Sequence, residues 1–445
     1  MSRIASGPTA GLSYSPLDGH YFDPPSLDME LERVFDVCHG CRLCFNLCPS
    51  FPALFRAVDA GGGDVRKLTE AQRNEVVDKC YQCKLCYIKC PYTPDDGHEF
   101  QLDFPRLMQR AKAVRARSRG IALRERLLAK PDLLGRLAGL TPRLANWANR
   151  LPPNRWLLEK VLGIHRRKLL PEFHGQTFQA WFDKTQAGKA LDGDNGKVFF
   201  FSTCFINYNN PDVGKAAIEI FARNRIAVKS DYRRCCGMPA LDGGDVAAAQ
   251  KLARENVAQM MPYVRDGYTI LAVNPTCSMM MRKEYPNLVE GEDVKAFAAA
   301  VMDPNEYLNG LRREGKLDTD FRSTPGRIAY HLPCHLRAQN IGYRSRDMMR
   351  AIGGETEVEL VAECCGHDGT WAMKKEWFET SLECGRKAFD GMKAPADAQM
   401  VTDCPLAAIQ FEQATGTRPL HPLQVLARAY REDGFPTPVA AADSP

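Results

Sequence analysis

Two copies of one cysteine pattern lie near the N-terminus of the chain. They are Cys38-x2-Cys41-x2-Cys44-x3-Cys48-Pro49 and Cys80-x2-Cys83-x2-Cys86-x3-Cys90-Pro91. Thiolates separated by two residues on a tight loop can reach adjacent irons of one 4Fe–4S cubane. Tetrahedral zinc, the competing interpretation, needs two cysteine pairs per site and uses neither the third cysteine nor a fourth followed by proline. The spacing therefore predicts two 4Fe–4S clusters and a protein that moves electrons.

The ligands of each cluster are expected to come from both runs. In bacterial two-cluster ferredoxins with this spacing, the fourth cysteine of a run ligates the other cluster. The first cluster is then held by Cys38, Cys41, Cys44 and Cys90. The second is held by Cys80, Cys83, Cys86 and Cys48.

The composition is that of a globular protein with unusually many cysteines. The chain has 445 residues, of which 44% are hydrophobic and 17 are cysteine, and this length suggests about three domains. Residues 1–23 lack a basic segment followed by an apolar one, and no window of 18 apolar residues occurs. We therefore expect a cytoplasmic protein whose clustered cysteines are metal ligands. The net charge of +5 does not favour nucleic acid as a partner.

The elements that are expected to position these cysteines indicate an α+β multidomain protein. Prolines punctuate the helical pattern after residue 101 and predict several short helices there, while Thr69 and Gln72 predict a capping box at the start of a helix over 69–78. The expected parts are an irregular arm (1–30), a mostly helical dicluster ferredoxin-like module (31–100), a helical connector (101–195), two α/β domains (196–322 and 323–430) and a flexible tail (431–445).

The two α/β domains are predicted to be duplicates, because their cysteines recur in one frame. The first set is Cys204, Cys235, Cys236 and Cys277, and the second is Cys334, Cys364, Cys365 and Cys404. Corresponding positions are offset by 130, 129, 129 and 127 residues. Strands are expected at 198–201, 226–228, 270–273, 328–331, 358–361 and 400–402, alternating with helices at 212–223 and 246–261. Because open α/β sheets bind ligands beyond the carboxyl ends of their strands, the four thiols of each repeat should converge. The glycine after each Cys-Cys pair is expected to let the backbone approach a cluster.

These motifs resemble the CCG (cysteine-rich) domains of heterodisulfide reductase B-type subunits. The order of a dicluster module followed by two such domains is similar to the C subunit of anaerobic glycerol-3-phosphate dehydrogenase and to the iron–sulfur subunits of glycolate and lactate oxidases. The resemblance covers about residues 31–425. It implies an iron–sulfur electron-transfer subunit of a multi-component oxidoreductase, with further clusters at the CCG sites.

The last motif of each repeat departs from the family pattern of Cys-x-x-Cys. It reads Cys277-Ser-Met-Met280 in the first repeat and Cys404-Pro-Leu-Ala407 in the second. Four thiols per site remain, which suffice for a cubane but are fewer than the five that the resemblance implies for a noncubane cluster. This loss argues against direct disulfide chemistry and leaves zinc, or a structural role, open at one or both sites.

Other residues carry weaker signals. His367, directly after Cys365-Gly366, is the candidate catalytic residue, although most histidines in such turns bond the backbone. His331 and His335 have the same ambiguity, and Cys384 fits neither frame and is expected to be a packed thiol on a helix. No Gly-x-Gly-x-x-Gly or Walker sequence predicts a bound nucleotide or flavin.

A basic stretch over residues 106–130 has two interpretations. Either its basic side chains meet water or an acidic neighbour, which we favour, or they touch anionic lipid at the inner face of the membrane.

The leading functional hypothesis is an electron carrier between a redox partner, either a flavin dehydrogenase or a rubrerythrin-like di-iron protein, and an acceptor. The alternatives are a disulfide or persulfide reductase acting at a CCG cluster, an electron donor for peroxide defence, and a zinc-stabilised scaffold.

Overall fold

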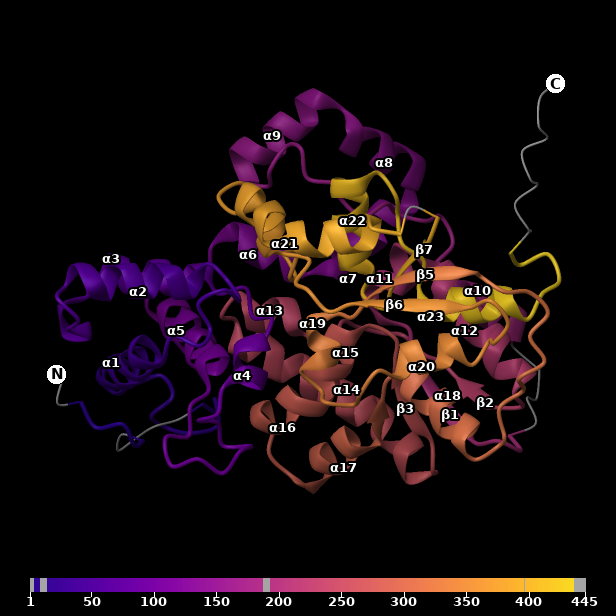
Figure 1. Cartoon of the computed structure of the whole chain (residues 1–445), viewed down its shortest axis with the longest axis horizontal. Helices are drawn as coiled ribbons and strands as arrows, with labels where there is room; N and C mark the ends of the chain where they lie inside the picture. Colours follow the sequence, from indigo (N-terminus) through magenta and orange to yellow (C-terminus); the bar gives the residue numbers. More distant parts are fainter. Residues whose placement is uncertain (1–3, 9–13, 187–192, 396, 436–445) are drawn as a thin grey trace.

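The computed structural model describes residues 4–8, 14–186, 193–395 and 397–435. Of the expected arm and tail, residues 1–3, 9–13 and 436–445 therefore lie outside the described residues. In Figure 1 the N-terminal helices form one side of the molecule, and the α/β domains form the other. The fold is mostly helical with two small parallel sheets, as the sequence predicts.

The dicluster module is helical. Its elements are α1 (Pro24–Cys41), α2 (Ser50–Ala60), η1 (Val65–Lys67), α3 (Glu70–Lys79), α4 (Leu85–Lys89) and α5 (Phe104–Arg119). Helix α1 begins inside the range expected to be irregular, because the Asp23 carboxylate accepts a hydrogen bond from the Ser26 amide and caps the helix. The capping box of Thr69 and Gln72 is confirmed at the start of α3.

The connector is a series of short helices, as its prolines predict. They are α6 (Leu123–Leu128), α7 (Pro131–Leu140), α8 (Pro142–Arg150), α9 (Pro152–Leu162) and α10 (Phe178–Gln186). Pro131, Pro142 and Pro152 each occupy the first position of a helix, where the missing amide hydrogen costs nothing.

The first α/β domain contains a four-stranded parallel sheet in the order β2-β1-β3-β4. Its elements are β1 (Lys197–Phe201), α11 (Thr203–Tyr208), α12 (Pro211–Arg223), β2 (Ala227–Lys229), α13 (Met238–Asp242), α14 (Val246–Arg265), β3 (Thr269–Ala272), α15 (Pro275–Met279), the π-helical turn η2 (Met280–Glu284), α16 (Tyr285–Leu288), α17 (Glu292–Ala300), β4 (Val301–Met302) and α18 (Pro304–Arg313). The short strand β4 was not predicted, because two residues carry no readable alternation.

The second α/β domain repeats this arrangement in a three-stranded parallel sheet, β6-β5-β7. Its elements are β5 (Arg327–His331), α19 (Cys334–Arg337), α20 (Arg344–Arg350), β6 (Glu357–Val361), η3 (Trp371–Met373), α21 (Phe378–Lys393), β7 (Gln399–Thr402), α22 (Pro405–Thr415) and α23 (Pro422–Ala429). Strands β1, β2 and β3 correspond to β5, β6 and β7, so all six predicted strands and the duplication are confirmed. In parallel sheets the carboxyl ends of the strands share one edge, which places the cysteines of each repeat together.

Candidate iron–sulfur and CCG sites

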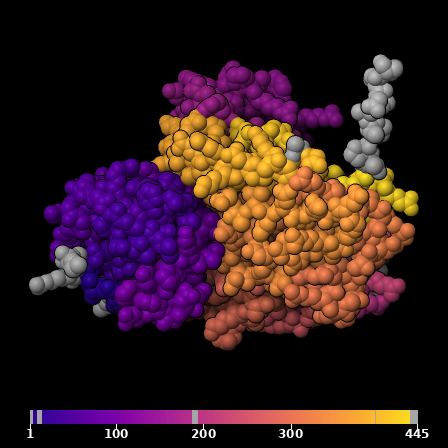
Figure 2. Space-filling view, in the orientation of Figure 1, coloured from indigo at the N-terminus to yellow at the C-terminus, as the bar shows by residue number. Residues whose placement is uncertain are grey.

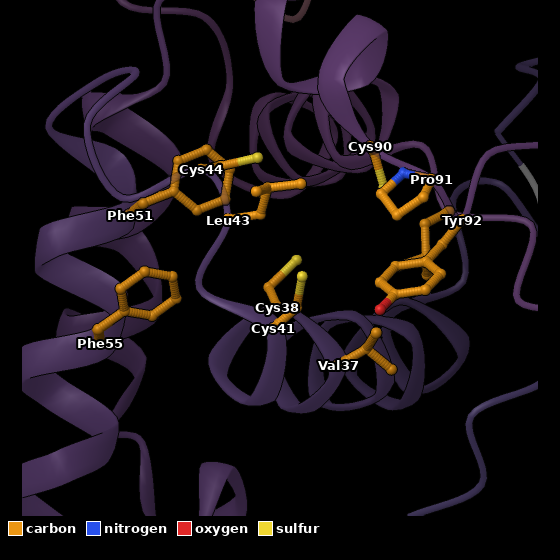
Figure 3. A pocket seen from close by; sticks show the side chains of 11 residues that line it. Val37, Cys38, Cys41, Leu43, Cys44, Phe51, Phe55, Cys90, Pro91 and Tyr92 are labelled. Carbon is orange, nitrogen blue, oxygen red and sulfur yellow. The ribbon is translucent and has the colours of Figure 1, made fainter.

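The first predicted cluster site is a hollow in the dicluster module near the protein surface. Cys38 and Cys41 lie on the last turn of α1, Cys44 lies in the loop that follows, and Cys90 directly follows α4. All four line one hollow of about 320 Å³. Figure 3 shows their sulfur atoms around this space, with Phe51 and Phe55 on one side. The second run thus supplies one thiol to the first run's hollow.

The second predicted cluster site is more deeply placed. Cys80, Cys83 and Cys86 are buried, and the charges of Cys83, Cys48 and Cys80 all raise the pKa of Cys86 after the larger effect of burial. The loop between them is tightly folded, because Gln82 and Lys84 adopt left-handed backbone conformations. The Gln82 side-chain amide lies 3.5 Å from the Cys80 sulfur.

The second repeat surrounds an open pocket with its thiols. Cys334, Cys364, Cys365 and Cys404 all line a hollow of about 430 Å³ at the carboxyl edge of the sheet. Pro275 and Thr276 of the first α/β domain close one side of it. Backbone amides point at its sulfur atoms, with Gly366 N 3.2 Å from Cys364 Sγ and Ala407 N 3.5 Å from Cys404 Sγ.

This pocket also contains a buried histidine without partners. His367 is 1% exposed and lines the pocket, yet both ring nitrogens lack a hydrogen-bond partner among the described residues. An unpaired buried polar group costs about 1–3 kcal/mol, so this imidazole suits a bound group. His331 and His335 differ, because His331 contacts Thr402 and the Glu363 carbonyl, while His335 contacts Thr276 and the Gln82 carbonyl.

The thiols of the first repeat lie close enough to shift one another's pKa. Each affects the pKa of the next in the order Cys204, Cys235, Cys236 and Cys277. The hydrogen bond to Cys235 and burial both raise the pKa of Cys204. The two repeats therefore have the same cysteine spacing, but their thiols are packed differently.

The glycine of each Cys-Cys-Gly motif has a backbone conformation that favours glycine. Gly237 and Gly366 have φ values of +95° and +72°, which disfavour other residues. A Cβ on Gly366 would lie 2.0 Å from the Ser381 carbonyl oxygen, and one on Gly237 would lie 3.4 Å from Leu252. The glycines are thus required by the turn and, in the second repeat, by close packing on α21, while their approach to a cluster stays a prediction.

The thiols of the second repeat are better suited to binding a polynuclear iron–sulfur cluster than to remaining free thiols. Burial raises the pKa of Cys404 to about 11, so this thiol stays protonated at neutral pH unless a bound cation stabilises the thiolate. The amide donors and the four thiols around one hollow are both features of cluster sites. Among the described residues, no group of three or more His, Cys, Asp or Glu side chains is arranged to hold a single metal ion.

Comparison with known proteins agrees with this arrangement. The cysteine-rich domain family (CCG) matches residues 198–282 and 328–412, and the 4Fe-4S dicluster domain matches residues 30–91. The C subunit of anaerobic glycerol-3-phosphate dehydrogenase from Escherichia coli K12 is 31% identical over 325 residues, which cover 73% of this chain and 81% of that relative. The chain belongs to this C-subunit family. It is an iron–sulfur protein of the kind that forms subunits of oxidoreductase complexes.

Two further relatives have the same character. Lactate utilization protein A of Geobacillus thermodenitrificans is 30% identical over 191 residues, 40% of this chain and 75% of the relative. The B subunit of fumarate reductase (CoM/CoB) from Methanothermobacter marburgensis is 26% identical over 250 residues, 53% of this chain and 47% of the relative.

In the present structure, the second CCG pocket and the second predicted cubane site meet at Tyr81. The Tyr81 hydroxyl lies 3.3 Å from Cys364 Sγ and 3.2 Å from the Leu47 carbonyl oxygen. Its ring packs on Trp371, whose indole nitrogen donates a hydrogen bond to the Asp78 carbonyl. Cys48 and Cys364 pack against the same buried cluster of side chains. Thiols from two sites about 280 residues apart in sequence therefore share one contact region.

Cys384 belongs to this contact region. It lies on α21 as expected, and it packs with Cys364 against the same buried cluster of side chains. The charge of Cys364 raises the pKa of Cys384, and Tyr81 lowers it. Burial raises its pKa to about 12. The sequence frame placed it in neither repeat, because α21 brings it to the junction only in three dimensions.

The helical connector reaches both CCG sites. The Asp132 carboxylate accepts hydrogen bonds from the Cys235 amide at 2.7 Å and from the Tyr232 hydroxyl at 2.6 Å. At the second site, burial lowers the pKa of Lys168 to about 7, although the charge of the nearby Cys365 would raise that pKa. No local signal distinguishes these residues from ordinary surface charges.

Proposed function

We propose that this protein is the electron-transfer subunit of a multi-component oxidoreductase, and that its thiol-lined sites work in series. Iron–sulfur clusters at these sites would supply one-electron transfer. The observation that carries the proposal is the contact of Tyr81 with Cys364, which links the second cubane site to the second CCG pocket.

The partner is proposed to dock at the first cubane site. Cys41 is exposed, and the large apolar side chains of Leu43, Phe45 and Ile88 are 45%, 51% and 46% exposed on the same loop and the short helix α4. Exposed apolar side chains around a redox centre are suited to a transient protein contact. One relative is named as a subunit of a dehydrogenase and none as a partner of a di-iron protein, so the proposed donor is a dehydrogenase, with a flavin as its redox group.

The cofactors are proposed to differ between the two CCG sites. Cys334, Cys364, Cys365 and Cys404, with His367 beside them, suit a cluster because they surround a cavity. Cys204, Cys235, Cys236 and Cys277 suit a structural role, because the described side chains there are not arranged to hold a metal ion and the Cys235 amide is bonded to Asp132. In this proposal the first site stabilises the domain, and the second completes the electron route.

Metal analysis of the anaerobically purified full chain tests this proposal. We expect about twelve irons and twelve acid-labile sulfides per chain, from two cubanes and one CCG cluster, and no stoichiometric zinc. EPR of the reduced protein should resolve interacting clusters. Fewer than about eight irons after reconstitution would contradict the dicluster assignment.

Tyr81→Phe should slow electron delivery to the second CCG site without loss of iron. A cluster-bound Cys364 thiolate can only accept, so the Tyr81 hydroxyl would turn its one hydrogen from the Leu47 carbonyl oxygen to the sulfur. Such donors raise a cluster's reduction potential. Losing a hydrogen bond of about 1 kcal/mol should lower that potential by roughly 40 mV. Redox titration followed by EPR measures the shift, and Tyr92→Phe at the first hollow is the matched control. An unchanged reduction potential of the second CCG cluster in Tyr81→Phe would contradict the proposed link between Tyr81 and that cluster.

A disulfide or persulfide reductase is the second candidate, because the second CCG pocket is open and contains His367. A change in the spectrum of the reduced protein on adding a small disulfide, lost in His367→Met, would favour it. Methionine is the control of choice because Met238 occupies the corresponding position of the first repeat.

A further inference from the structure

A buried histidine, His335, joins the three parts of the chain that carry the predicted cysteine sites. It lies on α19 of the second repeat and is 3% exposed. Its Nδ1 atom lies 2.9 Å from the Thr276 hydroxyl oxygen of the first repeat, and its Nε2 atom lies 3.0 Å from the Gln82 carbonyl oxygen of the dicluster module. Thr276 directly precedes Cys277, and His335 directly follows Cys334. One imidazole ring therefore contacts segments that carry cysteines of three different sites.

The two contacts decide which ring nitrogen of His335 carries the hydrogen. A carbonyl oxygen can only accept a hydrogen bond, so Nε2 donates to Gln82 and Nδ1 accepts from the Thr276 hydroxyl. Burial lowers the pKa of His335 to about 4, so the ring is neutral at neutral pH and has the one donor and one acceptor that these partners require. A carboxylate oxygen of Asp368 lies 3.8 Å from Nε2, which is too far for a hydrogen bond.

The backbone that carries His335 is fixed at the boundary between the two repeats. The buried Gln339 side-chain nitrogen lies 3.0 Å from the His335 carbonyl oxygen. The same nitrogen lies 3.2 Å from the Pro275 carbonyl oxygen and 2.9 Å from the Ser278 hydroxyl oxygen, both in the first repeat. The imidazole is therefore held in place from its main chain as well as through its ring.

On the other side of the contact, the loop around Gln82 depends on support from its surroundings. Gln82 and Lys84 have φ values of +58° and +60°, which are unfavourable for residues other than glycine. Such conformations persist only where the neighbouring structure holds them. The Lys84 ammonium pairs with the buried Glu284 carboxylate of the first repeat, and His335 binds the Gln82 carbonyl. The α/β domains therefore fix this loop at two points.

Ion pairs also hold the dicluster module, which Figure 2 shows packed directly against the α/β domains. Four arginines of the basic stretch over residues 106–130 meet acidic neighbours. The pairs are Arg106 with Glu284, Arg124 with Glu376, Arg115 with Asp78 and Arg119 with Glu70. The first two pairs reach the α/β domains, and the acidic-neighbour interpretation describes all four side chains. No helix among the described residues is long and apolar enough to cross a bilayer.

The contact with His335 also fixes the direction of the amide that follows Gln82. Across a planar trans peptide bond the carbonyl and the N–H point in opposite directions, so the Cys83 amide points away from His335. Cys83 is buried, and among the described residues its amide donates to no oxygen. Buried amides are rarely left unpaired. This amide is therefore available to a sulfur atom at the second predicted cubane site.

A second histidine makes the same pair of contacts inside one domain. Like His335, His331 has a threonine hydroxyl oxygen 2.9 Å from Nδ1 and a carbonyl oxygen, that of Glu363, 3.2 Å from Nε2. Glu363 directly precedes Cys364, so each histidine holds the carbonyl before a predicted ligand cysteine. Both partners of His331 belong to the second repeat. The contacts of His335 are thus distinguished by the fact that they cross between domains.

We propose that His335 is a positioning residue for the second cubane site: it holds the Gln82–Cys83 peptide so that the Cys83 amide stabilises the reduced state of that site. The inference rests on the clusters of the proposed function. Hydrogen bonds to cluster sulfurs raise the reduction potential. Loss of the contact between His335 and the Gln82 carbonyl should therefore lower the potential of the second cubane.

Two substitutions of His335 separate its two contacts. The side-chain amide of glutamine can reach the position of Nε2 and donate to the Gln82 carbonyl, whereas that of asparagine reaches only the position of Nδ1. At a fixed applied potential, His335→Asn should lower the ratio of reduced to oxidised second cubane by about fivefold, the effect of one hydrogen bond. His335→Gln should stay close to wild type. Redox titration of the anaerobic full chain, followed by EPR, measures both.

His331→Asn is the matched control, because it removes the same kind of contact from within the second repeat. It should act on the second CCG site and leave the potential of the second cubane unchanged. Thr276→Val removes the hydrogen bond to Nδ1 of His335 while keeping the side-chain shape, and it should shift the second cubane in the same direction as His335→Asn. Unchanged iron content and circular dichroism show that the variants fold and keep their clusters.

The outcomes distinguish this role from the proposed function. Loss of the second cubane's iron in His335→Asn but not in His335→Gln would support the same positioning role in a stronger form. The role is overturned if the potential is unchanged in His335→Asn, if His335→Gln shifts it equally, or if His331→Asn has the same effect. Fewer than about eight irons in the reconstituted wild-type protein would instead overturn the proposed function, and this inference with it.

Discussion

Replacing Cys90 with serine is expected to remove the cluster of the first cysteine run, although Cys90 belongs to the second run. Its thiol lines the hollow formed by Cys38, Cys41 and Cys44. Loss of one of four thiolate ligands should cost that site about four irons and four sulfides per chain. Iron analysis and EPR of the anaerobic protein measure this loss, and the signal of the second cubane should persist.

Cys48→Ser is the matched variant and should have the opposite result. Burial raises the pKa of Cys48 well above its usual value, and the charge of the nearby Cys80 raises it further. The Cys48 thiol therefore belongs with the buried second site. Cys48→Ser should therefore remove the second cubane and leave the first. If Cys90→Ser instead destroyed the second run's cluster, each run would bind its own cluster and the exchange of fourth ligands would be wrong.

Cys404→Ser should abolish electron delivery to the final acceptor while both cubanes are retained. Cys404 lines the second CCG pocket, which the Tyr81 contact connects to the second cubane site. Its loss should eliminate the iron at that pocket, reducing total iron by about four per chain. Stopped-flow reduction of the acceptor, with the cubanes prereduced, measures the effect.

Cys277→Ser is the corresponding variant of the first repeat. We expect it to keep its iron, to lower the melting temperature by several degrees, and to keep electron delivery near the wild-type rate. The basis is that Cys277 is buried beside Cys236, in a group whose Cys235 amide is bonded to Asp132. If Cys277→Ser lost iron and electron delivery as Cys404→Ser does, the two CCG sites would be equivalent and the proposed division between them would fail.

Much of the fold was predictable because its signals are local. The six strands of the two repeats are short β-branched or aromatic runs, and the helix starts carry prolines or capping residues. The start of α1 was missed, since its signal is one Asp23 cap before two prolines in a segment rich in glycine and serine. The strand β4 was missed because pairing with β3, rather than its own two residues, defines it.

The sequence by itself determined which cysteines matter and that they form four groups, because ligand spacing is set by the covalent chain and strand ends of a parallel sheet share one edge. Only the tertiary structure decided how those groups differ. Whether a group of thiols encloses a cavity or closes on itself depends on side-chain packing from distant segments, as His367 and Asp132 show. How each repeat meets the dicluster module depends on how the domains dock. The second repeat meets it through Tyr81, and the first through the pairing of Glu284 with Lys84 and Arg106. Although burial alone would raise it, those two cations lower the pKa of Glu284 to about 2. Contacts of this kind join residues hundreds of positions apart, so no local pattern can encode them.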